Sequence, residues 1–215
     1  EGLWLKLVNR NKRTIVLDVK DPGDIDVLLS LVDDAHVLVE NSRPGTMERL
    51  GLGPAELLDR NPSLVITRVS GFGQDGPYAS RPGFATIAEA MSGLAALNGE
   101  PDGQPLLPPI ALTDEVTGLA AAFATKVALH SGVVQVVDAN LLETMFQMMG
   151  PLASLYPYPN KALAPALPIA QVPRESYWLS PARTSPSRIV LLVPSRILAT
   201  GAETPAAITP RNCQA

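Results

Sequence analysis

Cysteine and histidine are scarce in this chain of 215 residues. The single cysteine, Cys213, excludes a disulfide within the chain and supports neither a cysteine-based metal site nor a cysteine nucleophile. The two histidines, His36 and His130, lie far apart in the sequence, and neither sits in a pattern typical of a metal site or a catalytic triad. We therefore assign both histidines structural roles, and we expect no bound metal and a cytoplasmic protein.

Dense basic clusters and long apolar segments are missing as well. The net charge is -4, and no group of Lys and Arg is dense enough to follow a phosphate backbone, so we expect no nucleic-acid partner. The longest apolar stretches, such as 119–124, are far shorter than the roughly 20 residues that span a membrane, and no signal-like segment opens the chain. We therefore expect no membrane partner.

What the chain has instead is alternation between β-branched runs and helical patterns. The strand pattern at 14–19 is followed by Asp21 and Pro22, a cap and an early helical proline, before the helical pattern at 25–32. The later patterns are a strand at 36–39, helical turns at 47–50 and 54–58, a strand at 63–69, a helix at 84–97, a helix at 113–130, a strand at 133–137 and a helix at 140–155. This alternation predicts an α/β fold with parallel β-α-β units.

The composition changes from residue 151 onward. Residues 151–215 hold 11 of the 21 prolines and six basic against two acidic residues, whereas residues 1–150 carry 11 basic and 19 acidic residues. Only 188–193 has a strand pattern in this part. We therefore predict an ordered domain over 1–156 and an irregular, proline-rich basic tail over 157–215. We also hypothesise a frameshifted or rearranged reading frame, which sequencing of the encoding locus tests.

A glycine pattern follows the strand predicted at 63–69. Gly71, Gly73 and Gly76 have the spacing G-x-G-x-x-G of a dinucleotide-binding fingerprint. That fingerprint needs its third glycine to open a helix, whereas Pro77 and the segment 81–83 keep the chain in a loop. A nicotinamide-dependent oxidoreductase is thus an alternative, while a loop that permits positive φ explains the glycines without any cofactor.

Two acidic residues open the helix predicted at 113–130. Thr113 suits the cap position, and the helix dipole favours Asp114 and Glu115 in the first turn, which explains both acids without catalysis. The same dipole would hold the pKa of Asp114 near or below the usual value of about 3.9, and covalent catalysis by aspartate requires an ionised carboxylate. The spacing leaves both interpretations open.

Six separated segments occur in unbroken order across residues 3–156. They are 9–13 (NRNKR), 17–20 (LDVK), 39–45 (VENSRPG), 71–78 (GFGQDGPY), 81–84 (RPGF) and 111–114 (ALTD). Together they resemble the class III CoA-transferase family, also called CaiB/BaiF, which includes formyl-CoA transferase, carnitine CoA-transferase and α-methylacyl-CoA racemase. The resemblance implies a Rossmann-like large domain with a parallel sheet and flanking helices, a small domain, and an interlocked homodimer.

The resemblance also implies CoA transfer from an acyl-CoA to a carboxylic acid acceptor. Asp114 matches the carboxylate that attacks the acyl-CoA thioester in the family's transferases, where a mixed anhydride and then an aspartyl-CoA thioester form. The family's racemases use a histidine at the position of Phe84, and because phenylalanine cannot accept a proton, transfer is favoured over racemisation. A racemase or epimerase remains the alternative within the family.

The resemblance places coenzyme A along three segments and beside one further residue, Arg49. Leu17, Asp18, Val19 and Lys20 match the part beside the adenine and ribose; Asn41, Ser42 and Arg43 match the nucleotide and pantetheine path; Arg49 matches a phosphate contact; Arg81, Pro82, Gly83, Phe84 and Ala85 match the channel lining.

The chain also departs from the family pattern. Ala85 stands where the family usually has an acid, and Glu89 where it usually has a glutamine. The family's first strand and small domain have no counterpart, and because the chain begins with Glu1 rather than Met we expect a missing N-terminus. A truncated, non-catalytic product that binds CoA or a partner is therefore a further alternative.

Overall fold

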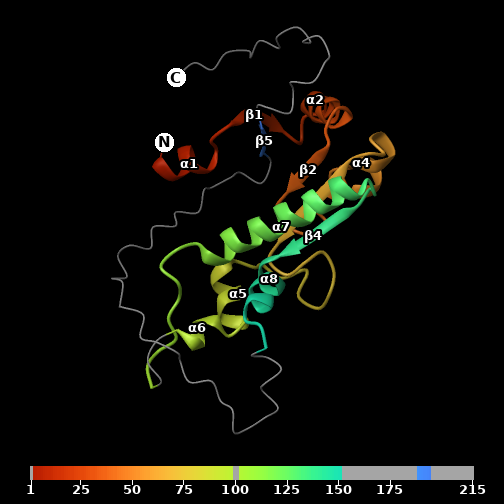
Figure 1. Cartoon of the computed structure of the whole chain (residues 1–215). Coiled ribbons are helices and arrows are strands. Elements are labelled where there is room, and N and C mark those ends of the chain that lie inside the picture. The colour runs from red at the N-terminus through yellow and green to blue at the C-terminus, as the bar shows by residue number, and fades with distance from the viewer. Residues whose placement is uncertain (1, 99–101, 152–187, 195–215) are drawn as a thin grey trace. The chain divides into compact units, whose positions relative to one another are not determined.

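The computed structural model describes residues 2–98, 102–151 and the backbone of 188–194 (Figure 1). The elements are α1 (Leu3–Val8), β1 (Lys12–Asp18), α2 (Pro22–Asp33), β2 (Val37–Glu40), α3 (Thr46–Arg49), α4 (Pro54–Arg60), β3 (Val65–Ser70), α5 (Ala85–Met91), α6 (Leu94–Leu97), α7 (Leu112–Ser131), β4 (Val136–Asn140), α8 (Leu141–Met148) and β5 (Arg188–Pro194). The chain divides into two compact units, residues 1–26 with 183–215 and residues 27–182, which are described in turn.

The first unit contains a two-stranded antiparallel sheet. β1 pairs with β5 from Lys12 opposite Pro194 to Asp18 opposite Arg188. The strand predicted at 188–193 is therefore confirmed, but the inclusion of the first strand in the parallel sheet is wrong, since β1 pairs only with β5 among the described strands. The rest of the predicted tail, and the boundary at 156, lie outside the described residues.

The second unit is built on a parallel sheet in the order β2-β3-β4. β3 is the central strand, with Val37 opposite Val65 on one side and Ile66 opposite Val136 on the other. Nearly every residue of β3 is buried, as expected of a central parallel strand covered on both faces. The predicted α/β fold with a parallel sheet and flanking helices is confirmed.

Helix α7 lies against this sheet and leads into β4 (Figure 1). The residues that it buries are small, which lets the helix axis approach the strands closely: Thr113, Thr117, Ala121 and Ala128. In the same stretch the hydroxyl of Thr125 lies 2.6 Å from the hydroxyl of Thr67 on β3. The helix predicted at 113–130 is thus confirmed to within a residue at each end.

Side-chain caps account for two other helix starts. Asp21 Oδ1 accepts hydrogen bonds from the backbone N–H groups of Gly23 at 2.8 Å and Asp24 at 3.2 Å, as the sequence predicts for the start of α2. Asn140 caps α8, and its amide oxygen and amide nitrogen bond the backbone and the carboxylate of Glu143 respectively. Each cap satisfies backbone donors that a helix leaves free at its first turn.

The helix predicted at 84–97 is broken in the structure. α5 ends at Met91, and Gly93, at φ +90°, precedes the separate short helix α6. An alanine-rich pattern predicts helix throughout this region, but the left-handed conformation of Gly93 interrupts the helical hydrogen bonds. The strand predicted at 133–137 also begins three residues later, at Val136.

Candidate functional site

The predicted site residues of the second unit meet at one end of the parallel sheet. Asn41 follows the carboxyl end of β2, and Gly71 follows that of β3. Because β4 runs parallel to β3, helix α7, which leads into β4, starts at this same end and brings Asp114 with it. Ligands of open parallel sheets bind outside the carboxyl ends of the strands. The topology therefore gathers the predicted residues at the expected place.

The loop after β2 is held by two hydrogen bonds, one exposed and one partly buried. The backbone N–H of Ser42 donates to Glu40 Oε2 at 2.5 Å, and the side-chain amide of Asn41 donates to the carbonyl of Val69 at 2.7 Å. The side chain of Arg43 is exposed. Ser42 and Asn41 thus shape the loop, and Arg43 is an exposed cation on it.

A buried arginine anchors this loop, and sequence patterns did not single it out. Arg68 on β3 donates from Nε to Glu40 at 2.7 Å and from Nη1 to Glu48 at 2.7 Å. The side chains of Arg68 and Glu40 are each 6% exposed. Burial opposes the charge of Arg68, but its bonds to both carboxylates outweigh this and raise its pKa, while its bond to Glu48 lowers the pKa of that carboxyl.

Arg49 lies on the surface at the end of α3. Its Nη2 donates to Thr46 Oγ1 at 2.9 Å. The guanidinium lies over Gly45, where an added Cβ would stand 3.1 Å from Arg49 Nη1. Gly45 has φ +77°, so glycine suits this position on both counts. Arg49 is exposed and is therefore open to an anionic ligand.

The glycine-rich loop after β3 folds back on itself, so that the backbone at Gly83 lies against the backbone at Gly71. An added Cβ on Gly71 would lie 2.6 Å from the Cα of Gly83, a distance that only two glycines permit. The backbone N–H of Gln74 also donates to Asp138 Oδ2 on β4 at 2.7 Å. Gly76 lies in the loop and opens no helix, since α5 begins only at Ala85. The dinucleotide fingerprint is not formed, as the prolines of this segment predict.

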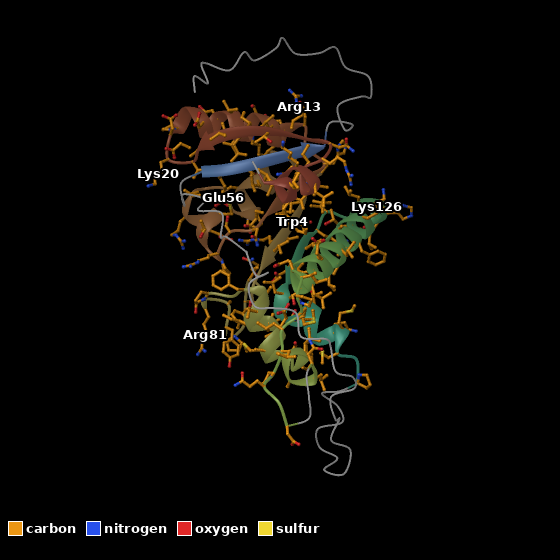
Figure 2. All side chains as sticks on the ribbon, turned by 90° about the vertical axis from the view of Figure 1, so that its left-hand side faces the viewer. Trp4, Arg13, Lys20, Glu56, Arg81 and Lys126 are labelled. Carbon is orange, nitrogen blue, oxygen red and sulfur yellow. The ribbon has the colours of Figure 1, made fainter. Side chains whose placement is uncertain are left out.

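Aromatic contacts organise the tip of this loop. The rings of Phe72 and Tyr78 have centroids 5.6 Å apart, and the Arg81 guanidinium lies 4.6 Å from the Tyr78 ring centre. Arg81 is on the surface of the second unit (Figure 2). Within the predicted segment, Pro82 and Phe84 are also exposed, whereas Gly83 and Ala85 are partly buried.

Asp114 lies in the first turn of α7 with an exposed side chain. Two predictions about this turn are wrong. Thr113 is not the cap: Ala111 holds that position without a side-chain hydrogen bond, and Thr113 is fully buried inside the helix. The pKa of Asp114 is not lowered: desolvation by the surrounding protein, and next the charge of Glu115, raise it. The effect of the helix dipole is outweighed, because desolvation penalises the ionised form.

Glu89 on α5 is connected to the turn that carries Asp114 by a hydrogen bond to Thr113, the residue before Asp114. The Thr113 hydroxyl donates to Glu89 Oε1 at 2.9 Å, and Glu89 is 4% exposed. Desolvation raises the pKa of Glu89, the charge of Asp114 adds to this, and hydrogen bonds from Thr113 oppose it. The sequence marked Glu89 only as a departure from the family pattern, whereas the structure connects it to the start of α7.

The segment Leu17 to Lys20 belongs to the first unit. Leu17 and Val19 are 4% and 3% exposed, so their side chains are core residues. Asp18 and Lys20 have exposed side chains, and Lys20 is marked in Figure 2. The backbone N–H of Lys20 donates to Asp18 Oδ1 at 3.0 Å, which tightens the turn after β1. Of the four predicted residues, Asp18 and Lys20 are those that can offer side chains to a ligand.

Neither a metal cluster nor a membrane helix occurs in the described part of the chain. Residues 2–98 and 102–151 contain no group of three His, Cys, Asp or Glu side chains that converge on one point. Over the same residues, no helix combines the length and the apolar character needed to cross a bilayer.

The fold is that of the CaiB/BaiF proteins. A CAIB/BAIF family protein from Brucella suis superimposes with a TM-score of 0.65 and 31% identity, over 69% of this chain and 40% of that one. The sequence model of CoA-transferase family III matches residues 1–180. The chain belongs to this family, and the resemblance found in the sequence is confirmed.

Individual relatives match between about half and two thirds of the chain. It is 42% identical over 151 residues to succinyl-CoA--D-citramalate CoA-transferase of Chloroflexus aurantiacus, over 68% of this chain and 38% of that protein. It is 49% identical over 105 residues to acetyl-CoA:oxalate CoA-transferase of Acetobacter aceti, over 49% of this chain and 27% of that protein. The matches therefore span less than half the length of each relative.

Proposed function

We propose that this protein transfers coenzyme A from an acyl-CoA to a carboxylic acid, with Asp114 as the residue that carries the acyl group and then CoA. The observation that supports this most directly is the position of Asp114 at the start of α7, at the carboxyl end of the parallel sheet where ligands bind in such folds. The relatives support the reaction class, because their names pair an acyl-CoA with a carboxylic acid.

The proposed reaction proceeds through covalent catalysis. A carboxylate oxygen of Asp114 attacks the thioester carbonyl, the C–S bond breaks, and a mixed anhydride and CoA thiolate result. The thiolate attacks the Asp114 carbonyl carbon and releases the donor as a carboxylate, which leaves an aspartyl-CoA thioester. An acceptor carboxylate attacks this thioester, and the same steps in reverse form the new acyl-CoA and free Asp114. Water must be excluded throughout, because it would hydrolyse the anhydride.

The direct test is to trap the acylated carboxylate. Folded protein is incubated with an acyl-CoA and hydroxylamine, which converts an anhydride or thioester at Asp114 into a hydroxamate, and the modified peptide is identified by mass spectrometry. We expect modification at Asp114 and none at Glu115. An unmodified Asp114 in protein that binds CoA would contradict the transfer reaction and would favour the alternative of CoA binding without turnover.

The pH dependence of acylation follows from the raised pKa of Asp114. The nucleophile is the ionised form, which is present above its pKa and lost as the pH falls through it. Because desolvation raises this pKa, the rate should begin to fall at a higher pH than an ordinary aspartate, with a pKa of about 3.9, would allow. The initial rate of hydroxamate formation against pH measures this, and a midpoint at or below the ordinary value would contradict it.

Exposed cations near the sheet end are proposed to bind the phosphates of CoA. Arg43, Arg49 and Arg81 of the second unit are exposed. A guanidinium suits phosphate because its planar fork donates two parallel hydrogen bonds. The remaining members of the predicted segments shape the backbone that carries these cations.

Replacing Arg49 with glutamine should weaken CoA binding by about tenfold to a hundredfold, since a hydrogen bond to a charged group contributes roughly 1.5–3 kcal/mol. Isothermal titration with CoA measures the change. Arg60→Gln is the matched control: Arg60 ends α4, before the amino end of β3, and pairs with Asp33. Equal loss of affinity in both variants would show that Arg49 acts only through the net charge.

The interlocked homodimer and the cytoplasmic location implied by the family stay predictions. Analytical ultracentrifugation of the protein, with and without CoA, tests the first, and fractionation of cells that express it tests the second.

A further inference from the structure

A buried carboxyl group on α5 holds the start of α7. Glu89 is 4% exposed, and Thr113, whose hydroxyl donates to it at 2.9 Å, is fully buried. The contact therefore joins two side chains that water does not reach, and it lies one residue from Asp114. Figure 1 shows α5 and α8 beneath the start of α7, and the three helices contact one another.

The first turn of α7 has no side-chain cap of its own for its backbone N–H groups. The first four N–H groups of a helix have no partner within the helix, and a side chain at the cap position normally supplies one. Here the cap position is Ala111, which has no side-chain acceptor. Thr113 donates to Glu89 through its hydroxyl, so α5 holds this turn through a side-chain hydrogen bond and not through a cap at Ala111. An acidic group near a helix start is further favoured by the helix dipole.

We propose that Glu89 is a positioning residue for Asp114, because it accepts the Thr113 hydroxyl from the neighbouring helix and so fixes the turn that carries the Asp114 carboxylate. The expected effect on acylation rests on the proposed function of Asp114, whereas the expected effect on the order of the first turn of α7 does not. A displacement of a reacting group by about 1 Å is enough to reduce a rate by roughly a hundredfold. Any loosening of this turn should therefore appear in the rate of acylation.

Three variants separate the hydrogen bond from the charge and from general packing. Glu89→Gln keeps the Oε1 acceptor and removes the charge. Glu89→Leu keeps the approximate volume and removes the acceptor. Thr113→Val keeps the shape of the threonine and removes its hydroxyl donor. Glu115→Gln is the control, since it changes an exposed acid in the same turn.

The measurements are amide hydrogen exchange along α7, the dissociation constant for CoA, and the rate of Asp114 acylation. In Glu89→Leu we expect exchange at residues 113–116 to rise about tenfold relative to residues 120–128, as expected for the loss of a buried hydrogen bond. We expect acylation to fall at least about tenfold, with CoA affinity changed less than about twofold. Glu89→Gln should recover both quantities to within about threefold of the natural protein, because its acceptor oxygen remains.

The outcomes decide between positioning and packing. Uniformly faster exchange along α7, with CoA affinity reduced in step with acylation, would overturn the inference in favour of a general packing role. Unchanged exchange at 113–116 in Glu89→Leu would also overturn it. If Glu89→Leu does not fold, Thr113→Val decides: exchange at 113–116 about threefold faster supports the inference, and unchanged exchange rejects it. If Asp114 is not acylated even in the natural protein, the proposed function fails, while the exchange data still decide whether Glu89 holds the first turn of α7.

Discussion

Substituting asparagine for Asp114 should abolish CoA transfer, lowering the rate by roughly a thousandfold or more, as expected when a covalent nucleophile is removed. The amide side chain of asparagine has nearly the shape of the carboxylate but cannot form the anhydride or the aspartyl-CoA thioester. The rate of transfer from succinyl-CoA or acetyl-CoA to a panel of carboxylic acids measures the loss, and trapping with hydroxylamine should give no product at position 114.

The control for this substitution is Glu115→Gln. It removes one acidic charge from the same exposed helical turn, so general electrostatic effects are matched. We expect Glu115→Gln to retain the rate within a few-fold. If Asp114→Asn retains it too, Asp114 does not carry the acyl group, and the predicted nucleophile is wrong. If both substitutions abolish the rate, the charge of the turn and not a covalent step is responsible.

Removing the buried arginine should destabilise the second unit strongly. Arg68→Met leaves Glu40 buried without its cationic partner, and breaking a buried ion pair in this way costs about 3–5 kcal/mol. Urea unfolding measures the change in the free energy of unfolding. Because Glu40 also accepts the backbone N–H of Ser42, loosening of this loop should weaken CoA binding in the same variant.

Arg60→Met is the matched control. It breaks an ion pair of similar short length with Asp33, but the side chains of that pair are 40% and 44% exposed, and solvent screening leaves such a pair little effect on stability. Equal losses in the two variants would contradict the account of Arg68. The double substitution Arg68→Met with Glu40→Leu should recover part of the stability, since no unpaired charge then remains buried.

The sequence determined the elements whose signals are local. Asp21 and Pro22 mark the start of α2, and Asp21 bonds the backbone of that helix as its pattern predicts. The alternation of strands and helices gave the parallel sheet, and the polar pair Asp114 and Glu115 marked the first turn of α7. Such features can be predicted from the sequence because both partners of each interaction lie within a few residues of one another.

The tertiary structure decided every feature whose partners are distant in the sequence. β1 pairs with β5, so its strand pattern was correct while its place in the parallel sheet was not. The raised pKa of Asp114 comes first from desolvation, which depends on the protein packed around the turn and not on the helix that carries it. In the sequence, Glu89 was only a departure from the family pattern, and Thr113 was the predicted helix cap. In the structure, both side chains are buried and are hydrogen-bonded to each other across two helices. Burial and long-range pairing arise only when the chain folds, and they set the electrostatics of this site.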